Sequence, residues 1–258
     1  MEAAGVALAA IGGLIFGSFA NVVVHRVPLK QSIVRPGSRC PSCGEPLRAR
    51  DNIPVVSWVL LGGKCRNCGA PISIRYPTIE FLTGMLFALA AWRIRPATDL
   101  VAYLPLLWVL VVLSFIDLEH KLLPNRIVIP ALASGIVLLG VSAALGPGID
   151  AWLRALGGAA VAFGSFFILA LISPRGMGMG DVKLSAVLGL AMAYQGWGRL
   201  FVGFLIAFAA GALGGIGLIA ARRAGMKSEV PFGPYLALGT IVSVLFGGPL
   251  VHAWLHRA

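Results

Sequence analysis

Charged side chains are scarce in this sequence, and their scarcity excludes a water-soluble globular protein. Only 12% of the 258 residues are Asp, Glu, Lys or Arg, whereas 58% are hydrophobic. A soluble domain of ordinary composition has about 25% charged residues. We therefore expect an all-α polytopic membrane protein.

Acidic residues are scarcer than basic ones. Ten Asp and Glu stand against 21 Lys and Arg, which gives a formal net charge of +11. Lys and Arg retained in cytoplasmic loops, together with attraction to anionic inner-leaflet lipid, account for this excess. The charge therefore indicates the lipid bilayer as a partner and does not imply nucleic-acid binding.

A cleavable signal peptide is not expected either. The first apolar segment has no basic start and no small-residue cleavage site, so it should remain in the mature protein. Apolar windows that suit a hydrocarbon core of about 30 Å predict about eight transmembrane helices, of which the second and sixth are short. They fall near residues 3–24, 78–93, 100–116, 127–145, 153–172, 182–196, 200–221 and 235–254.

Basic residues are divided unevenly between alternate loops. Nine lie between residues 26 and 75, and seven more fall within 121–126, 175–183 and 222–227. Because Lys and Arg in short loops are retained in the cytoplasm, we expect these loops on the cytoplasmic side and both termini outside. The remaining five basic residues are Arg93, Arg95, Arg154, Arg199 and Arg257.

Cysteine is absent except in the polar segment 26–77. Its four cysteines form two Cys-x2-Cys pairs, Cys40/Cys43 and Cys65/Cys68, separated by 21 residues. This spacing is typical of a tetrahedral four-cysteine zinc site, and four thiolates leave no open position for a catalytic water. Two disulfides are the alternative, which a reducing cytoplasmic loop disfavours. We expect a small loop domain stapled by structural Zn²⁺, since so short a segment buries little core.

A glycine-rich turn precedes the apolar window that begins at residue 182. It contains Gly178-Met-Gly-Asp181, and glycines such as Gly178 and Gly180 allow another chain to approach the backbone closely. We therefore expect a substrate peptide to lie against this turn. Asp181 would stand at the start of a membrane helix, and the alternative is that it serves only as a helix N-cap.

A second carboxylate, Asp117, directly follows the apolar window 100–116. Counting crossings places Asp117 and Asp181 at the same, inner edge of the membrane. Two neighbouring carboxylates do not both ionise cheaply, so one keeps a proton while the other acts as a base. This pair predicts an aspartyl protease that activates water against a peptide bond. Alternatively both residues are solvated helix ends.

Together these motifs resemble the type IV prepilin peptidases, bifunctional leader peptidases and N-methyltransferases of the GxGD aspartyl protease group. The resemblance runs nearly end to end. Its pieces are Gly17-Ser-Phe-Ala-Asn21, His25-Arg26-Val-Pro28, the two cysteine pairs, Asp51-Asn-Ile-Pro54, Ser73-Ile-Arg-Tyr-Pro77 with Glu80, Asp117 with Pro124-Asn125, Gly178-Met-Gly-Asp181 with Lys183, and Pro231-Phe-Gly-Pro234.

The resemblance implies catalytic roles for Asp117 and Asp181 and a place in the bacterial inner membrane. It also implies cleavage after the glycine of a basic leader on prepilins or pseudopilins, then methylation of the new amino terminus with S-adenosylmethionine. No βαβ unit fits between residues 26 and 77, so the methyl donor needs another kind of site. The candidates by resemblance are Asn21, Arg26, Asp51, Arg75, Glu80 and Gly84.

Substrate contacts are expected from Gly178, Gly180 and Lys183. The loop 26–77 is itself basic, so Glu119 and Glu229 are expected to attract the basic leader. The sequence thus divides into a first helix (1–25), a zinc loop domain for methyl transfer (26–77) and a protease core (78–258). Two other functions share some of these features: a presenilin-like intramembrane protease, and a transporter with a zinc-ribbon regulatory loop.

Overall fold

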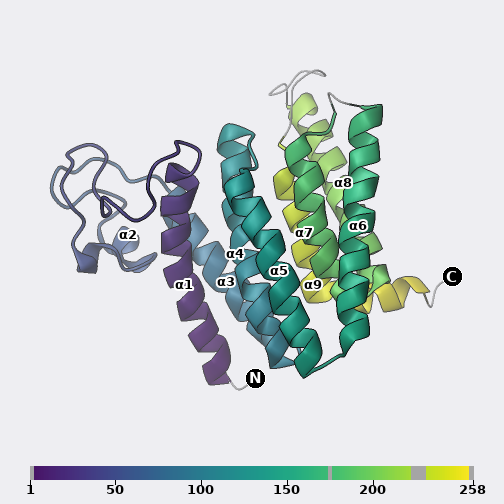
Figure 1. Ribbon diagram of the computed structural model, residues 1–258. Coiled ribbons are helices and arrows are strands. Elements are labelled where there is room, and N and C mark those ends of the chain that lie inside the picture. The colour runs from purple at the N-terminus through teal and green to yellow at the C-terminus, as the bar shows by residue number, and fades with distance from the viewer. Residues whose placement is uncertain (1–2, 174–175, 222–230, 256–258) are drawn as a thin grey trace. The chain divides into compact units, whose positions relative to one another are not determined.

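The computed structural model describes residues 3–173, 176–221 and 231–255, and these residues are predominantly helical (Figure 1). No β-strand forms among them, and two isolated β-bridges lie in the cysteine-bearing loop. The elements are α1 (Ala3–Arg26), η1 (Ala49–Asp51), α2 (Val56–Leu60), α3 (Arg75–Arg93), α4 (Ala97–His120), α5 (Asn125–Leu145), α6 (Ile149–Ile172), α7 (Met179–Gln195), α8 (Trp197–Ala220) and α9 (Gly233–Leu255).

Each of the eight predicted apolar segments forms a helix, but the number of membrane crossings is not confirmed as eight. Six helices in the described ranges are long and apolar enough to cross a membrane: α1, α4, α5, α6, α8 and α9. The other two are the short segments. Helix α7 has only 17 residues, and the first six residues of α3 include Arg75, Thr78 and Glu80.

The chain forms two compact units, an N-terminal unit (residues 1–92) and a C-terminal unit (residues 93–258). In the N-terminal unit, α1 packs against α3 through glycines. A Cβ atom on Gly17 would lie 2.6 Å from Glu80 Cα, and one on Gly13 would lie 2.8 Å from Gly84 Cα. Small residues allow such close backbone contact between membrane helices. Asn21 of α1 and Glu80 of α3 therefore belong to the same packed pair of helices.

The C-terminal unit is built around α7. Nearly all of its side chains from Val182 to Tyr194 are buried, which is typical of a helix surrounded by others. Its closest neighbour is α6, since a Cβ on Gly189 would lie 2.4 Å from the Gly158 carbonyl oxygen. Tyr103 of α4 donates a hydrogen bond of 2.7 Å to the Ala191 carbonyl.

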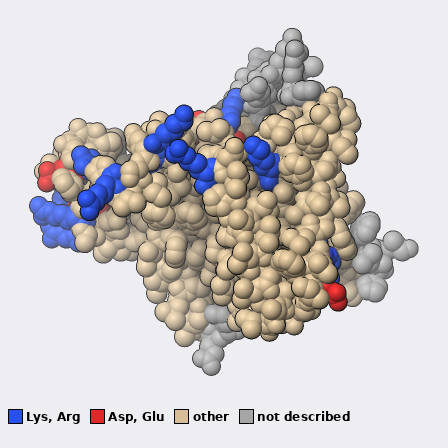
Figure 2. Space-filling view, viewed as in Figure 1, with Lys and Arg blue, Asp and Glu red and all other residues tan. Residues whose placement is uncertain are grey.

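Charged side chains are almost absent from the flanks of α4 to α9 that Figure 2 shows. These helices expose large apolar side chains, such as Val137, Val141 and Leu213. A hydrocarbon environment accepts such a surface, whereas water would not. The exposed apolar surface therefore agrees with a multi-pass membrane protein.

Candidate active site and metal centre

Two carboxylates lie at the same end of the C-terminal unit. Asp117 is in the last turn of α4 and is buried, and Asp181 is in the first turn of α7. The chain reverses direction between successive helices, so the end of α4 and the start of α7 meet at one end of the bundle (Figure 1). Gly233, which contacts Asp117, and Gly180, which precedes Asp181, both pack against Leu123. The structure thus brings together the two residues that the sequence predicted as a pair.

Gly233, the first residue of α9, holds Asp117 in place. Its backbone N–H donates a 2.9 Å hydrogen bond to Asp117 Oδ2. A Cβ atom on Gly233 would lie 2.8 Å from the same oxygen, so only glycine fits without displacing the carboxylate. The segment Pro231-Phe-Gly-Pro234 was part of the resemblance, but Gly233 was assigned no role, because a glycine gives no signal of what its N–H contacts.

Asp181 occupies the third position of α7, and Gly178 is the N-cap residue. Asp181 therefore stands just inside the start of the helix and not at its N-cap position. Asp181 Oδ1 is buried and has no hydrogen-bond partner within the protein. A buried carboxylate oxygen is stable only with a proton, a donor or water beside it. This atom suits a reacting water or a substrate carbonyl.

Leu123 packs between the glycines of this site. A Cβ on Gly180 would lie 2.9 Å from Leu123 Cβ, and one on Gly233 would lie 3.3 Å from Leu123 Cδ2. The first turns of α7 and α9 thus pack against the same side chain, that of Leu123. Leu123 was not predicted as a site residue, since an isolated leucine after a membrane helix has no distinguishing pattern.

The predicted substrate residues lie around this end of the unit. Lys183 Nζ donates a 3.1 Å hydrogen bond to Asn125 Oδ1 at the start of α5. Glu119 is exposed in the last turn of α4, and Gly178 is exposed beside Asp181 Oδ2. Glu229 falls outside the described residues.

The four cysteines converge in the N-terminal unit. Their sulfur atoms all lie within 4.8 Å of one another, and Cys40 Sγ is 3.8 Å from Cys68 Sγ. A tetrahedral site with Zn–S bonds of about 2.3 Å places sulfurs about 3.8 Å apart, whereas a disulfide needs about 2.0 Å. All four thiols are free. The donor set and its spacing therefore fit zinc, and the disulfide alternative does not fit.

Two equivalent hairpins create this convergence. The amide of Cys40 donates to the Glu45 carbonyl at 2.9 Å, and the amide of Cys65 donates to the Ala70 carbonyl at 2.8 Å. Gly44 (φ +73°) follows the first pair and Gly69 (φ +71°) follows the second; this left-handed backbone favours glycine.

Backbone amides also favour the thiolate that a metal needs. The amides of Cys43 and Ser42 lower the pKa of the Cys40 thiol to about 6. Deprotonated sulfur is the form that binds zinc.

Asn21, Glu80 and Thr83 are the buried polar residues among the described residues of α1 and α3. Glu80 Oε2 accepts a 2.7 Å hydrogen bond from the Val55 N–H, and Val55 has a φ of 61°, which is strained for a β-branched residue. Asn21 Nδ2 donates to the Tyr76 carbonyl at 3.1 Å, while Asn21 Oδ1 is buried without a partner. A ligand with donor groups, such as an ammonium or hydroxyl, would satisfy this oxygen.

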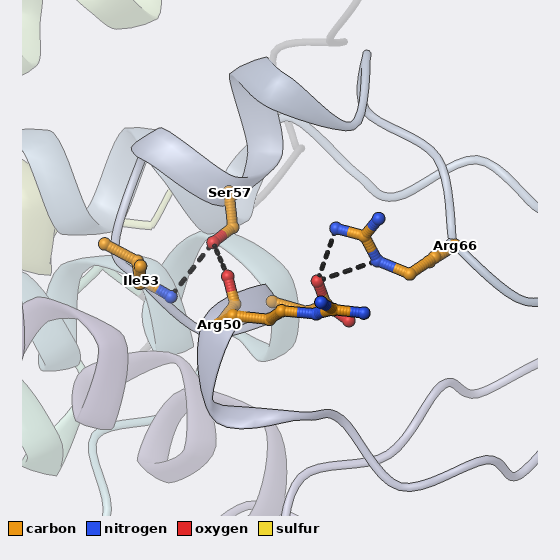
Figure 3. A network of polar contacts seen from close by, with 5 residues as sticks. Arg50, Ile53, Ser57 and Arg66 are labelled. Carbon is orange, nitrogen blue, oxygen red and sulfur yellow. Dashed lines mark hydrogen bonds and ion pairs between the residues drawn. The ribbon is translucent and has the colours of Figure 1, made fainter.

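Asp51 has a structural role on the loop. Arg66 donates to Asp51 Oδ1 through Nε at 2.9 Å and through the terminal nitrogen at 2.8 Å, and this guanidinium holds the pKa of Asp51 below its usual range. Beside it, Ser57 Oγ donates to the Arg50 carbonyl at 2.8 Å and accepts from the Ile53 N–H at 3.1 Å (Figure 3). These contacts fix the turn from η1 into α2.

The other three predicted cofactor residues also lie in the N-terminal unit. Arg26 ends α1 and donates to the Ser32 carbonyl at 3.0 Å. Arg75 begins α3 and lies 5.1 Å from the centre of the Tyr76 ring. Gly84 lies at the α1–α3 contact, where a Cβ would be 3.0 Å from Leu14 side-chain atoms. Gly84 therefore contributes helix packing.

Comparison with known proteins gives matches over both units. Residues 11–94 match the bacterial peptidase A24 N-terminal domain, and residues 104–216 match the type IV leader peptidase family. A prepilin leader peptidase/N-methyltransferase of Aeromonas hydrophila is 37% identical over 94% of this chain and 91% of its own length.

Two further relatives carry the same name. The protein of Myxococcus xanthus (strain DK1622) is 45% identical over 84% of this chain and 64% of its own length. The protein of Bacillus subtilis (strain 168) is 33% identical over 96% of this chain and 97% of its own length. No solved structure matches the chain.

Proposed function

Because this chain belongs to the family of prepilin leader peptidase/N-methyltransferases, we propose that it cleaves prepilins at Asp117 and Asp181 and methylates the new amino terminus in its N-terminal unit. The observation that carries the cleavage site is the pairing of a buried Asp117, held by the Gly233 N–H, with Asp181 at the same end of the bundle. Membership of this family argues against the two alternative functions, a presenilin-like protease that acts on general substrates and a transporter.

Cleavage uses the two carboxylates in different protonation states. The Gly233 N–H favours the ionised form of Asp117, whereas Asp181 Oδ1, which has no donor, favours a proton on Asp181. Asp117 takes a proton from water, and the hydroxide forms a bond to the scissile carbonyl carbon. Asp181 gives its proton to the carbonyl oxygen. The carbon–nitrogen bond then breaks as the leaving amine takes a proton from Asp117, and one hydroxyl group of the intermediate returns its proton to Asp181, which restores the starting state of both carboxyl groups.

Substrate recognition is proposed around the same carboxylates. The resemblance implies a short basic leader that ends in glycine and precedes a residue that is usually phenylalanine. The glycines before Asp181 leave the backbone open to an extended peptide, and Glu119 is exposed two residues after Asp117 in the last turn of α4. We place the leader against Gly178 and Gly180, with its basic side chains toward Glu119 and toward Glu229, which lies in the sequence between α8 and α9.

Methylation is proposed at the α1–α3 pair. S-adenosylmethionine supplies an electrophilic methyl group when bound. The residues fit such a molecule, because Asn21 Oδ1 is a buried acceptor without a partner and Glu80 is a buried carboxylate nearby on the helix pair. The new amino terminus must lose a proton before it attacks a methyl group, and Glu80 takes that proton. Arg26, Asp51 and Arg75 shape the loop beside this pair.

The charge distribution supports an orientation of the protein in the membrane. We propose that the protein lies in the bacterial inner membrane with Asp117, Asp181 and the cysteine loop on the cytoplasmic side. The sixteen basic residues of the 26–77 loop and its companion loops support this orientation.

The direct test of the function is an assay on the purified protein with a prepilin. Without S-adenosylmethionine, intact-mass analysis should show loss of the leader. With S-adenosylmethionine, it should show loss of the leader and the gain of one methyl group. An unchanged precursor under both conditions would refute the proposal.

The cysteine cluster is expected to bind zinc structurally. Purified protein should contain about one zinc per chain, since four thiolates complete one tetrahedral site. Cys40→Ser should lower the zinc content and expose residues 40–68 to proteases, because the loop has little core of its own. Elemental analysis and limited proteolysis measure the two effects. Ser42→Ala, a change inside the same hairpin but not at a ligand, should retain zinc; a metal-free reduced wild-type protein would contradict the site.

Gly233→Ala is expected to reduce cleavage at least about tenfold. The added methyl group would lie 2.8 Å from Asp117 Oδ2, and displacing a catalytic group by about 1 Å has an effect of that size or larger. Gly215→Ala is the matched control, because a Cβ there meets no atom within 4 Å and alanine favours a helix by up to about 1 kcal/mol over glycine. Initial rates of leader removal distinguish the two; equal rates for both variants would show that Gly233 does not position Asp117.

A further inference from the structure

Four arginines converge at the end of the C-terminal unit that lies away from Asp117 and Asp181. Arg93, Arg95, Arg154 and Arg199 line a cavity of about 400 Å³. Asp99 of α4 also lines it, and it stands 18 residues before Asp117, about 27 Å along the helix. The cavity is therefore separate from the protease site.

This convergence is unexpected from the charge pattern of the sequence. Only five of the 21 Lys and Arg fall in the loops and helix ends that the sequence assigns to the outer side of the membrane, and four of the five line this one cavity. The four come from three separate places in the chain: the α3–α4 connection, the second turn of α6 and the first turn of α8. Their gathering is a feature of the fold.

The cavity is strongly positive. Asp99 is the one acidic residue among the side chains that line it, so four arginines and one carboxylate leave a formal charge of +3. Asp99 Oδ1 already accepts hydrogen bonds from the Ser142 hydroxyl and, at 3.2 Å, from the Tyr194 hydroxyl. Asp99 therefore already has two hydrogen-bond donors, and both are neutral hydroxyl groups.

Two of the arginines are held in position by backbone carbonyls. Arg154 donates through Nε to the Ala193 carbonyl at 2.8 Å and through Nη2 to the Tyr194 carbonyl at 2.7 Å. Arg199 Nη1 donates to the Val244 carbonyl at 3.2 Å. A guanidinium has five N–H donors, so these bonds use only part of each group. Arginines fixed in this way are pre-organised for an anion.

A tryptophan near the cavity supports a position at the level of the lipid head groups. Trp197 is half exposed at the start of α8, two residues after the lining residue Gln195. Exposed tryptophan at the end of a membrane helix is typical of the membrane–water interface. Anionic groups at the membrane surface would therefore have access to the cavity.

We propose that this arginine cavity binds a phosphate group, contributed either by the head group of an anionic phospholipid or by a soluble phosphate. Planar guanidinium groups pair with phosphate oxygens in a two-pronged geometry. A bound phosphate would offset the repulsion among the four arginines, and it would join the ends of α4, α6, α8 and α9 at the outer face.

The test compares phosphate sources on the full-length protein in phosphatidylcholine nanodiscs. Phosphatidylglycerol in the nanodisc, or millimolar inorganic phosphate in the buffer, should raise the Tm by at least about 3 °C relative to phosphatidylcholine alone, as expected for a ligand that binds only the folded state. A rise with phosphatidylglycerol alone assigns the site to lipid. A rise with inorganic phosphate assigns it to the phosphate group itself.

Variants distinguish phosphate binding in this cavity from a general effect of charge on the Tm. Arg95→Gln with Arg199→Gln should abolish the Tm rise, and Arg95→Gln alone, which leaves the Arg199 hydrogen bonds intact, should reduce it. Prepilin cleavage by both variants confirms that they fold. Arg126→Gln, which removes an exposed charge at the start of α5, should keep the full rise. If neither phosphate source raises the wild-type Tm, or if the double variant responds like wild type, the proposal is wrong.

Discussion

Asp117→Asn and Asp181→Asn are each expected to lower the rate of leader cleavage by at least about 1,000-fold, within the range that acid–base catalysis supplies. An amide neither takes a proton from water nor passes one to the leaving amine. Both substitutions keep the size of the side chain, and in Asp117→Asn the amide oxygen still accepts the hydrogen bond from the Gly233 N–H. The fold should therefore survive while the chemistry is lost.

Rates from intact-mass analysis of a prepilin measure this effect, and zinc content with Tm checks the fold. Asp99→Asn is the matched control, because Asp99 is a buried carboxylate on the same helix α4 but lies about 27 Å away. It should cleave at close to the wild-type rate. Substantial cleavage by either Asp117→Asn or Asp181→Asn would remove that residue from the mechanism.

Glu80→Ala is expected to give a product that is correctly cut but not methylated, with methylation reduced at least about 100-fold. Glu80 lies in the N-terminal unit, whereas both protease carboxylates lie in the C-terminal unit. Removing Glu80 takes away the base for the new amine and leaves the cleavage residues unchanged. The two products differ by the mass of one methyl group.

A conservative variant separates chemistry from loop structure. Glu80 also accepts the N–H of Val55, whose φ of 61° is strained, so alanine removes a loop contact together with the carboxylate. Glu80→Gln keeps an acceptor for Val55 and removes only the base, and it should fail in methylation as Glu80→Ala does. Full methylation by Glu80→Gln would show that Glu80 acts by holding the loop. Loss of both activities in a folded, zinc-loaded variant would favour one shared site.

The helices were predictable from the sequence because long apolar runs in a membrane protein have few alternatives. The same reasoning counted α3 and α7 as membrane crossings, which the structure does not confirm. Helix α7 is short and buried among its neighbours, so its apolar character reflects a position inside the bundle as much as contact with lipid. Apolar length alone does not distinguish these two environments.

The site was predictable where a residue type carries its own chemistry. Asp117, Asp181 and the two cysteine pairs stand out because carboxylates beside apolar runs and paired thiols are rare. Gly233 and Leu123 were missed since their roles come from a backbone N–H and from packing, which depend on chain segments far apart in sequence. The arginine cavity was missed for the same reason: its residues are spread from 93 to 199.

The measurement that tests the two-site account most directly uses a peptide that is already cut. A mature pilin peptide with a free amino-terminal phenylalanine is incubated with S-adenosylmethionine and Asp181→Asn protein, and its mass is determined. The account predicts methylation at close to the wild-type rate, because the acceptor amine is supplied and the N-terminal unit is unchanged. An unmethylated peptide, from a variant that keeps its zinc and its Tm, would contradict the assignment of the two activities to separate sites.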